Sequence, residues 1–238
     1  MPGLTDQIIP VLLRWIHVLF GIIWIGHLYF FNFVNVNFEK SIDASMKKPI
    51  IPQLRPRALW WFRWGAMITM LSGVTYIFWE QFAAGKQGFA TWFQSGNNVW
   101  ITYGMLLGLI MWFNVWFIIW PNQKIILTGI STGNKPADFD ARVATAGKFS
   151  RINTYLSVPM LFGMVGRSHF AIGDISAGTA ADGTRITRPD WVPVLIAMAI
   201  VSAIGFAVAY HFIWMVGPKV GKEFISAAPA APPPAPPK

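Results

Sequence analysis

The chain has 238 residues, of which 54% are hydrophobic and only 12% are charged. A soluble domain typically carries about twice that charged fraction, so the composition points to an integral membrane protein with aromatic belts. The absence of cysteine excludes disulfides, cysteine–zinc sites, iron–sulfur clusters and covalent c-type haem.

Five apolar stretches reach or approach the roughly 20 residues that cross a bilayer. A backbone in lipid must satisfy its own hydrogen bonds, so each stretch is predicted to be a helix. They cover approximately residues 8–34, 58–79, 98–120, 150–170 and 191–216, the fourth being the weakest. The start of the chain lacks the basic region of a secretory signal peptide, so the first stretch is expected to be retained. The sequence therefore predicts an all-α integral membrane bundle of about five helices over residues 1–217.

The segments between these helices alternate in charge. Thirteen lysines and arginines fall in one set of alternating segments, and three fall in the other. The positive-inside rule then places the N-terminus outside and the C-terminus in the cytoplasm. This topology explains the net charge of +9 without nucleic acid.

The connecting segments have distinct compositions. Pro121 is expected to end the third helix, and residues 138–148 have helical character, either on the membrane or leading into the fourth helix. Residues 172–190 are rich in Gly, Ala, Asp and Thr and suggest an irregular loop. Residues 218–238, rich in proline and alanine, suggest a mobile extended tail. Glu80 and Asp190 are expected to be solvated at helix ends.

All four histidines of the chain lie in or at the end of a predicted span, where a histidine is costly and needs a reason. With a rise of 1.5 Å per residue, His17 lies roughly 13 Å deep and His27 roughly 15 Å further in. His169 lies in the outer half of the fourth helix, and His211 in the inner half of the fifth. Two pairs are predicted: His17 with His169, and His27 with His211.

Bis-histidine pairs near the two faces suit b-type haem, because imidazole ligates haem iron and a porphyrin fits between apolar helices. Arg63 and Arg167 lie at suitable depths to bind haem propionates. His17 and His27 point about 80° apart, and their axial gap of about 15 Å is tight for two haems. The sequence therefore leaves one haem and two haems both open.

Each of these residues also has a plainer interpretation. A histidine in a helical bundle can simply be hydrogen-bonded to a neighbouring polar side chain. Arg63 follows Arg57 by six residues and can extend its side chain to the inner surface. No hydrolytic motif, phosphate-binding loop or pair of acidic residues within a span is present, so the sequence offers no catalytic residues.

Four segments resemble one bacterial family: RWIHVLFGIIWIGHLYFFNF, PRALWWFRWGAM, NVWFIIWPNQK and SRINTYLSVPMLFGMVGRSHF. They are similar to the urate oxidase N-terminal family, the membrane domain of membrane-bound urate hydroxylases. In that family the membrane domain is followed by a cytochrome c domain, and urate is oxidised to 5-hydroxyisourate. The resemblance implies a redox-linked protein of the bacterial inner membrane. The chain has fewer helices than longer members and no C-x-x-C-H, so it resembles a short form without the cytochrome.

Three functions remain open. The first is a haem b electron-transfer subunit of a respiratory or oxidase-type complex, with other membrane or redox subunits as partners. The second is a cofactor-free accessory subunit of a larger membrane enzyme. The third is a urate-type hydroxylase that works with a separate cytochrome c.

Overall fold

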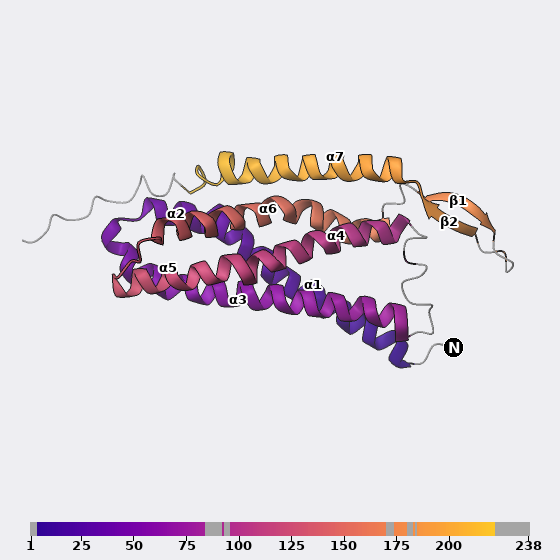
Figure 1. Ribbon diagram of the computed structural model, residues 1–238, viewed down its shortest axis with the longest axis horizontal. Helices are drawn as coiled ribbons and strands as arrows, with labels where there is room; N and C mark the ends of the chain where they lie inside the picture. The colour runs from indigo at the N-terminus through magenta and orange to yellow at the C-terminus, as the bar shows by residue number, and fades with distance from the viewer. Residues whose placement is uncertain are drawn as a thin grey trace, which may run out of the picture.

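The computed structural model describes residues 4–83, 92, 96–169, 174–179, 183 and 185–221. This part is almost entirely helical, and long helices lie side by side along one axis (Figure 1). The elements in chain order, η marking a π-helix, are α1 (Leu4–Tyr29), η1 (Phe30–Asn35), α2 (Val36–Ser41), α3 (Ala44–Phe78), η2 (Trp79–Ala83), α4 (Gly96–Phe113), η4 (Asn114–Ile119), α5 (Trp120–Thr132), α6 (Phe139–His169), β1 (Asp174–Thr179), β2 (Arg185–Pro189), α7 (Trp191–Tyr210) and η5 (His211–Val216).

The bundle consists of two antiparallel helix pairs and one covering helix. α1 packs mainly on α3, α4 packs mainly on α6, and α7 lies against α6 (Figure 1). We call the end that carries the β1–β2 hairpin the hairpin end. The opposite end, where α2 and the turn between α5 and α6 lie, is the basic end. Toward the hairpin end, α1 and α3 diverge from α4 and α6 (Figure 1).

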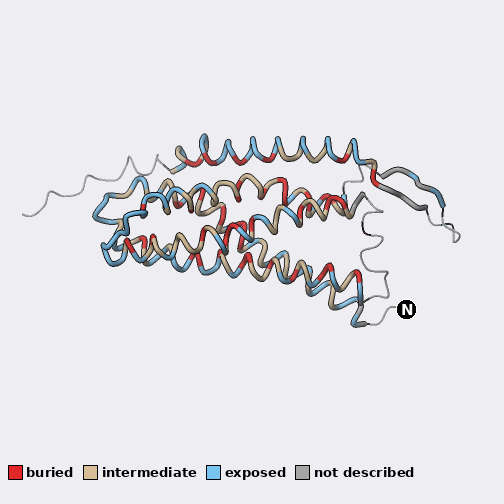
Figure 2. The backbone as a smooth tube through the Cα atoms, in the orientation of Figure 1, coloured by how far each residue is buried: buried red, intermediate tan, exposed pale blue. Residues whose placement is uncertain are grey.

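Three of the helical rods are long and apolar enough to cross a membrane: Gln7–Ser41, Asn98–Thr132 and Trp191–Val216. Their surfaces fit that environment. Large apolar side chains such as Trp15, Ile22 and Val192 are exposed, and the outer side of α7 is exposed along its length (Figure 2). An exposed apolar surface of this extent is unusual for a soluble protein and ordinary for one solvated by lipid.

Glycines set the closest approach between helices. A Cβ at Gly163 would lie 2.7 Å from the Gly104 nitrogen, and one at Gly65 would lie 3.1 Å from the Trp24 nitrogen. Backbones this close leave no room for a side chain, so α4 contacts α6, and α1 contacts α3, through small residues. Larger side chains fill the core on either side, among them Leu28, Phe62, Met111 and Val115.

Helix ends follow local chemistry. Asp43 begins α3, because its Oδ1 accepts the Ser45 backbone N–H at 2.9 Å. Asp190 begins α7 in the same way through the Val192 N–H at 3.3 Å. Gly133, with φ of +78°, ends α5 in the left-handed conformation that glycine adopts without strain.

The structure corrects two expectations about the connections and decides between two alternatives for a third. Pro121 does not end the third helix: it lies at the start of α5, directly after η4, and the rod continues to Thr132. Residues 174–179 and 185–189 form an antiparallel hairpin with a register shift between Ser176 and Gly178, instead of an irregular loop. Residues 138–148 lead into the fourth helix, one of the two alternatives, because α6 starts at Phe139. The expected tail lies, beyond residue 221, outside the described residues.

Candidate functional site

Four π-helical segments interrupt the described helices, and each contains or adjoins polar residues. η2 contains Glu80, η4 begins at Asn114, and η5 begins at His211. η1 follows shortly after His27 and contains the buried Asn32 and Asn35. Short π-helices are rare and occur frequently at functional sites. The irregular turns therefore mark the places where this bundle departs from plain packing.

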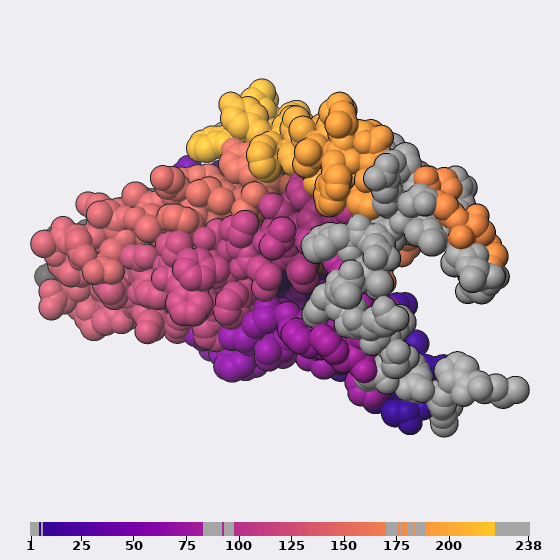
Figure 3. Space-filling model, turned by 45° about the vertical axis from the view of Figure 1, so that its right-hand side comes forward, coloured from indigo at the N-terminus to yellow at the C-terminus, as the bar shows by residue number. Residues whose placement is uncertain are grey.

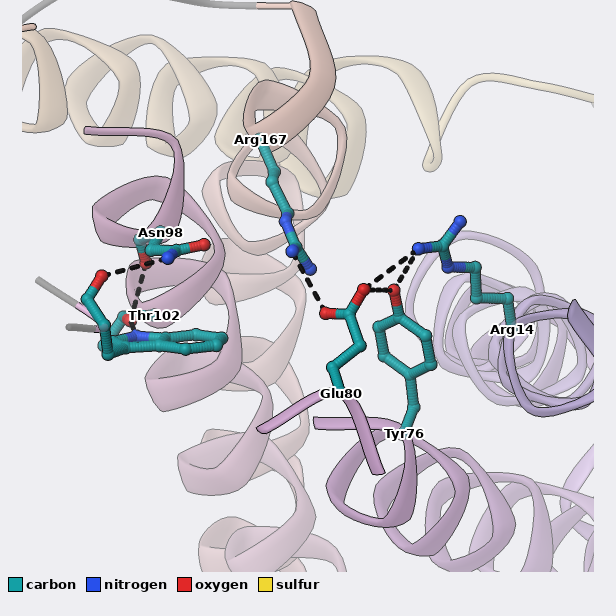
Figure 4. Close-up of polar contacts among 7 residues, drawn as sticks. Arg14, Tyr76, Glu80, Asn98, Thr102 and Arg167 are labelled. Carbon is teal, nitrogen blue, oxygen red and sulfur yellow. Dashed lines mark hydrogen bonds and ion pairs between the residues drawn. The ribbon is translucent and has the colours of Figure 1, made fainter. Parts of the chain in front are cut away.

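Glu80 is the centre of a polar network at the hairpin end (Figure 4). Arg167 of α6 donates to Glu80 Oε2 at 3.1 Å, and Arg14 of α1 donates to Glu80 Oε1 at 3.3 Å. Tyr76 of α3 donates to Glu80 Oε1 and accepts from Arg14. The network joins α1, η2 and α6 where the helix pairs diverge.

Glu80 is not solvated as the sequence suggested. Its side chain is 15% exposed, against 26% for Arg167 and 59% for Arg14. A carboxylate held this closely at a membrane surface needs countercharges, and the two arginines provide them. Sequence reasoning missed this role because the partners are far apart in the chain. Arg14 precedes Glu80 by 66 residues, and Arg167 follows it by 87.

His17 is fixed against the neighbouring helix. Its Nδ1 lies 2.8 Å from the Thr69 carbonyl oxygen, and a Cβ at Gly73 would lie 2.8 Å from its ring. A carbonyl only accepts, so Nδ1 carries the hydrogen in this bond and the neutral ring keeps its lone pair on Nε2. A histidine that binds a metal commonly donates its other ring N–H to a carbonyl or carboxylate in this way. That bond fixes the tautomer and the orientation of the ring.

Two other histidines also donate a hydrogen bond from Nδ1 to a backbone carbonyl oxygen. His27 Nδ1 lies 2.7 Å from the Ile23 carbonyl oxygen, and His169 Nδ1 lies 3.3 Å from that of Val165. Both bonds stay within one helix turn. His211 is exposed beside Phe212 at the start of η5. In the described part of the chain no hydrogen bond or ring contact joins any two of the four histidines, and no group of three or more His, Cys, Asp or Glu side chains is arranged for a metal ion.

The level of His17 relative to His169 follows from the packing of α1 on α6. Tyr29 and Ser157 share a hydrogen bond of 2.9 Å. The helices are antiparallel, and each histidine lies twelve residues toward the hairpin end from this bond, about 18 Å. The bond of 2.8 Å from Asn32 to Ser150 gives a second register, in which His169 lies about 6 Å further out.

The second pair is arranged differently. The rings of Phe33 and Phe212 are in contact, with centroids 5.7 Å apart and planes tilted by 37°, which sets η1 level with η5. His27 precedes Phe33 by six residues and His211 precedes Phe212 by one, so the two are staggered by roughly 7 Å. Side chains lean toward the N-terminus of their own helix. In the antiparallel first pair the two side chains lean in opposite directions along the bundle axis. In this parallel pair they lean the same way.

The two predicted arginines have different surroundings. Arg167 is engaged by Glu80, as described above. Arg63 is half-buried against two indoles: its Cζ lies 3.4 Å from the centroid of the Trp120 ring and 5.6 Å from that of Trp116. A guanidinium stacked on an indole is stabilised by the negative face of the ring.

Sequence reasoning also missed a buried amide pair between η4 and α6. Asn114 Nδ2 donates to Asn153 Oδ1 at 2.8 Å, and Asn153 Nδ2 donates to the Met111 carbonyl at 3.0 Å. Asn153 is fully buried. The pair supplies a donor to a backbone carbonyl near the start of a π-helix, where the regular bonding pattern changes. We read it as packing support for the site.

Comparison with known proteins identifies the class to which this bundle is related. Residues 87–181 match the family model described as "Urate oxidase N-terminal". The match, over 95 of the 238 residues, confirms the resemblance to the urate oxidase N-terminal family. The matched region contains α4, η4, α5 and α6, with Asn153, Arg167 and His169. No curated protein and no solved structure matches the chain.

Proposed function

We propose that the protein is a membrane subunit that binds b-type haem and carries electrons within a redox complex. The observation that carries the proposal is the hydrogen bond from His17 Nδ1 to the Thr69 carbonyl, which leaves Nε2 as a ligand nitrogen at membrane depth. When bound, a b-type haem supplies a centre that accepts and releases single electrons.

His17 and His169 are the proposed axial ligands of one haem at the hairpin end. Two features support the pair: each histidine donates its Nδ1 hydrogen to a backbone carbonyl, and the two histidines lie within about one turn of the same level. The divergence of α1 and α3 from α4 and α6 lies at this end, and the surface is recessed there between α3 (purple) and α4 (magenta) in Figure 3.

The chain's own residues have separate roles in this proposal. The Thr69 carbonyl and Gly73 hold the His17 ring, and Gly73 provides the space that the ring occupies. Arg167 lies two residues before His169 and shares its charge between Glu80 and a propionate. The stagger between His27 and His211 gives a second haem less support than the first, so we propose one haem.

The proposed topology has all five long helices crossing a bacterial inner membrane, with the basic end in the cytoplasm. α3 and α6 contain 35 and 31 residues, which exceeds the roughly 20 needed. Electron partners are then other membrane redox subunits or a cytochrome c.

The test is the haem content of the purified protein, measured as extracted haem per chain, with matched histidine variants. The proposal expects about one haem in the wild type and loss of most of it in His17→Ala and His169→Ala. His211→Ala is the control and keeps the wild-type content. Loss of haem in His27→Ala and His211→Ala, with His17→Ala unaffected, would contradict the His17–His169 site. It would indicate a haem site nearer the basic end.

A cofactor-free accessory subunit is the second candidate. The bonds of His27 and His169 to carbonyls of their own helices favour it, because a purely structural histidine makes the same bond. It predicts normal co-purification with a larger membrane enzyme after all four histidines are replaced.

A further inference from the structure

A second cationic group lies at the basic end and serves no role in the His17 site. Arg63 and Lys124 both lie over Trp120, with 3.4 Å from Arg63 Cζ and 5.8 Å from Lys124 Nζ to the ring centroid. Within the described residues, neither side chain has a carboxylate partner: the ion pairs found there involve Arg14, Arg55, Arg142 and Arg167. Two cations around one ring without an anion form a site for a negative ligand.

The guanidinium of Arg63 remains open on one side. Its Nε is enclosed without a hydrogen-bond partner, and so is the indole Nε1 of Trp116. The two terminal nitrogens of Arg63 are neither hydrogen-bonded in the described structure nor enclosed. They present the forked pair of donors that recognises phosphate and carboxylate oxygens.

The depth of the group matches the headgroup layer. Trp120 follows Asn98, the start of its span, by 22 residues, or about 33 Å, which is close to the thickness of the hydrocarbon core. Exposed indoles lie beside it: Trp64 packs edge-on against Trp116 at 5.7 Å, and Trp60 lies 6.4 Å from Trp64. Tryptophans concentrate at this layer of a membrane.

We propose that Arg63 and Lys124 bind the phosphate of an anionic phospholipid beside Trp120. The arginine fork takes the phosphate oxygens, the lysine adds a second positive charge, and the exposed indoles contact the upper acyl chains. The proposal is independent of haem. Arg63 lies ten residues, about 15 Å, along α3 from Gly73, where His17 packs.

Native mass spectrometry of the detergent-purified protein tests this directly. Phosphatidylglycerol is added in one arm and phosphatidylcholine with the same acyl chains in the other. The wild type is expected to retain phosphatidylglycerol preferentially. Arg63→Gln and Lys124→Gln are each expected to weaken its binding about fivefold, since one basic residue near a lipid surface is worth about 1 kcal/mol.

Lys135→Gln is the matched control, because it removes one basic charge that lies over Phe139 at 5.0 Å, outside the Trp120 group. It is expected to leave phosphatidylglycerol binding unchanged. Lys124 is exposed, so Lys124→Gln provides the test if Arg63→Gln fails to fold.

Three results would overturn the proposal: equal retention of the two lipids, unchanged lipid binding in both glutamine variants, or displacement of the lipid by millimolar inorganic phosphate. Loss of haem from Arg63→Gln with lipid binding intact would instead assign Arg63 to a propionate. A colourless wild type that binds phosphatidylglycerol would reject the haem proposal and keep this one.

Discussion

Tyr29 of α1 and Ser157 of α6 share a hydrogen bond of 2.9 Å, and His17 and His169 each lie twelve residues toward the hairpin end from it. The bond thus sets two distant histidines at nearly the same level on antiparallel helices, and the Asn32–Ser150 bond places His169 about 6 Å further out. This arrangement distinguishes the His17–His169 pair from the His27–His211 pair. The pair on α1 and α6 is nearly level, while the pair on α1 and η5 is staggered by roughly 7 Å.

Gly73→Ala is expected to disturb the His17 site without affecting the rest of the bundle. The new Cβ would lie 2.8 Å from the His17 ring, so the ring must leave the Thr69 carbonyl and Nε2 changes direction. We expect haem content to fall several-fold, measured as haem per chain. Gly108→Ala is the control, because its Cβ meets only flexible methionine atoms at 3.9 Å or more. Equal haem content in the two variants would contradict the proposed role of His17.

Gly163→Ala is expected to destabilise the bundle by about 1–3 kcal/mol, the usual cost of overpacking a tight contact. The reason is that its Cβ would lie 2.7 Å from the Gly104 nitrogen, a backbone atom that cannot move aside alone. Thermal unfolding in detergent measures the effect. Gly108→Ala on the same interface is expected to be neutral or slightly stabilising, since alanine favours the helix. If both variants unfold at the same temperature, α4 and α6 do not pack as described.

Glu80→Gln is expected to lower stability by about 1–2 kcal/mol, because Arg167 loses its charged acceptor in a partly enclosed site. Arg14→Gln is expected to cost less, since that side chain is 59% exposed and water screens its ion pair. Unfolding of the two variants side by side gives the order. A larger effect for Arg14→Gln would show that the network depends on the α1 contact instead.

Asp43 gives the bundle a small dependence on pH. The Ser45 backbone N–H lowers the pKa of the Asp43 carboxyl, so its stabilising effect is present above the unfolded pKa of about 3.9 and is lost as pH falls through the lower folded value. Asp43→Asn removes this titration and keeps a capping side chain. The melting-temperature difference between wild type and Asp43→Asn should therefore shrink on acidification from about pH 6 to pH 3. A difference independent of pH would contradict the assignment.

The sequence predicts the helices well because lipid makes long apolar runs obligatory helices. It predicts their ends poorly. Composition predicts a stop at Pro121, yet the proline lies where η4 passes into α5 and the helical rod continues beyond it. The hairpin at residues 174–189 carries no clear alternation of apolar residues, so composition suggested a loop.

Sequence reasoning proposed the candidate site from the depths of the histidines, and that site stays a prediction. Residue spacing placed His17 and His169 at one depth, which the Tyr29–Ser157 register supports. It could not find Glu80 as the acceptor of two arginines, because that role depends on how distant helices meet. It also assigned Arg63 to an anion without showing the indole of Trp120 beneath it.

The difference spectrum between reduced and oxidised purified protein tests the central claim most directly. With His17 and His169 as axial ligands, the account predicts a sharp α-band and a shifted Soret band, typical of bis-histidine b-type haem. Both should be lost in His17→Ala, with the helix content of the bundle unchanged. A colourless, iron-free wild type that is folded and assembled would contradict the account.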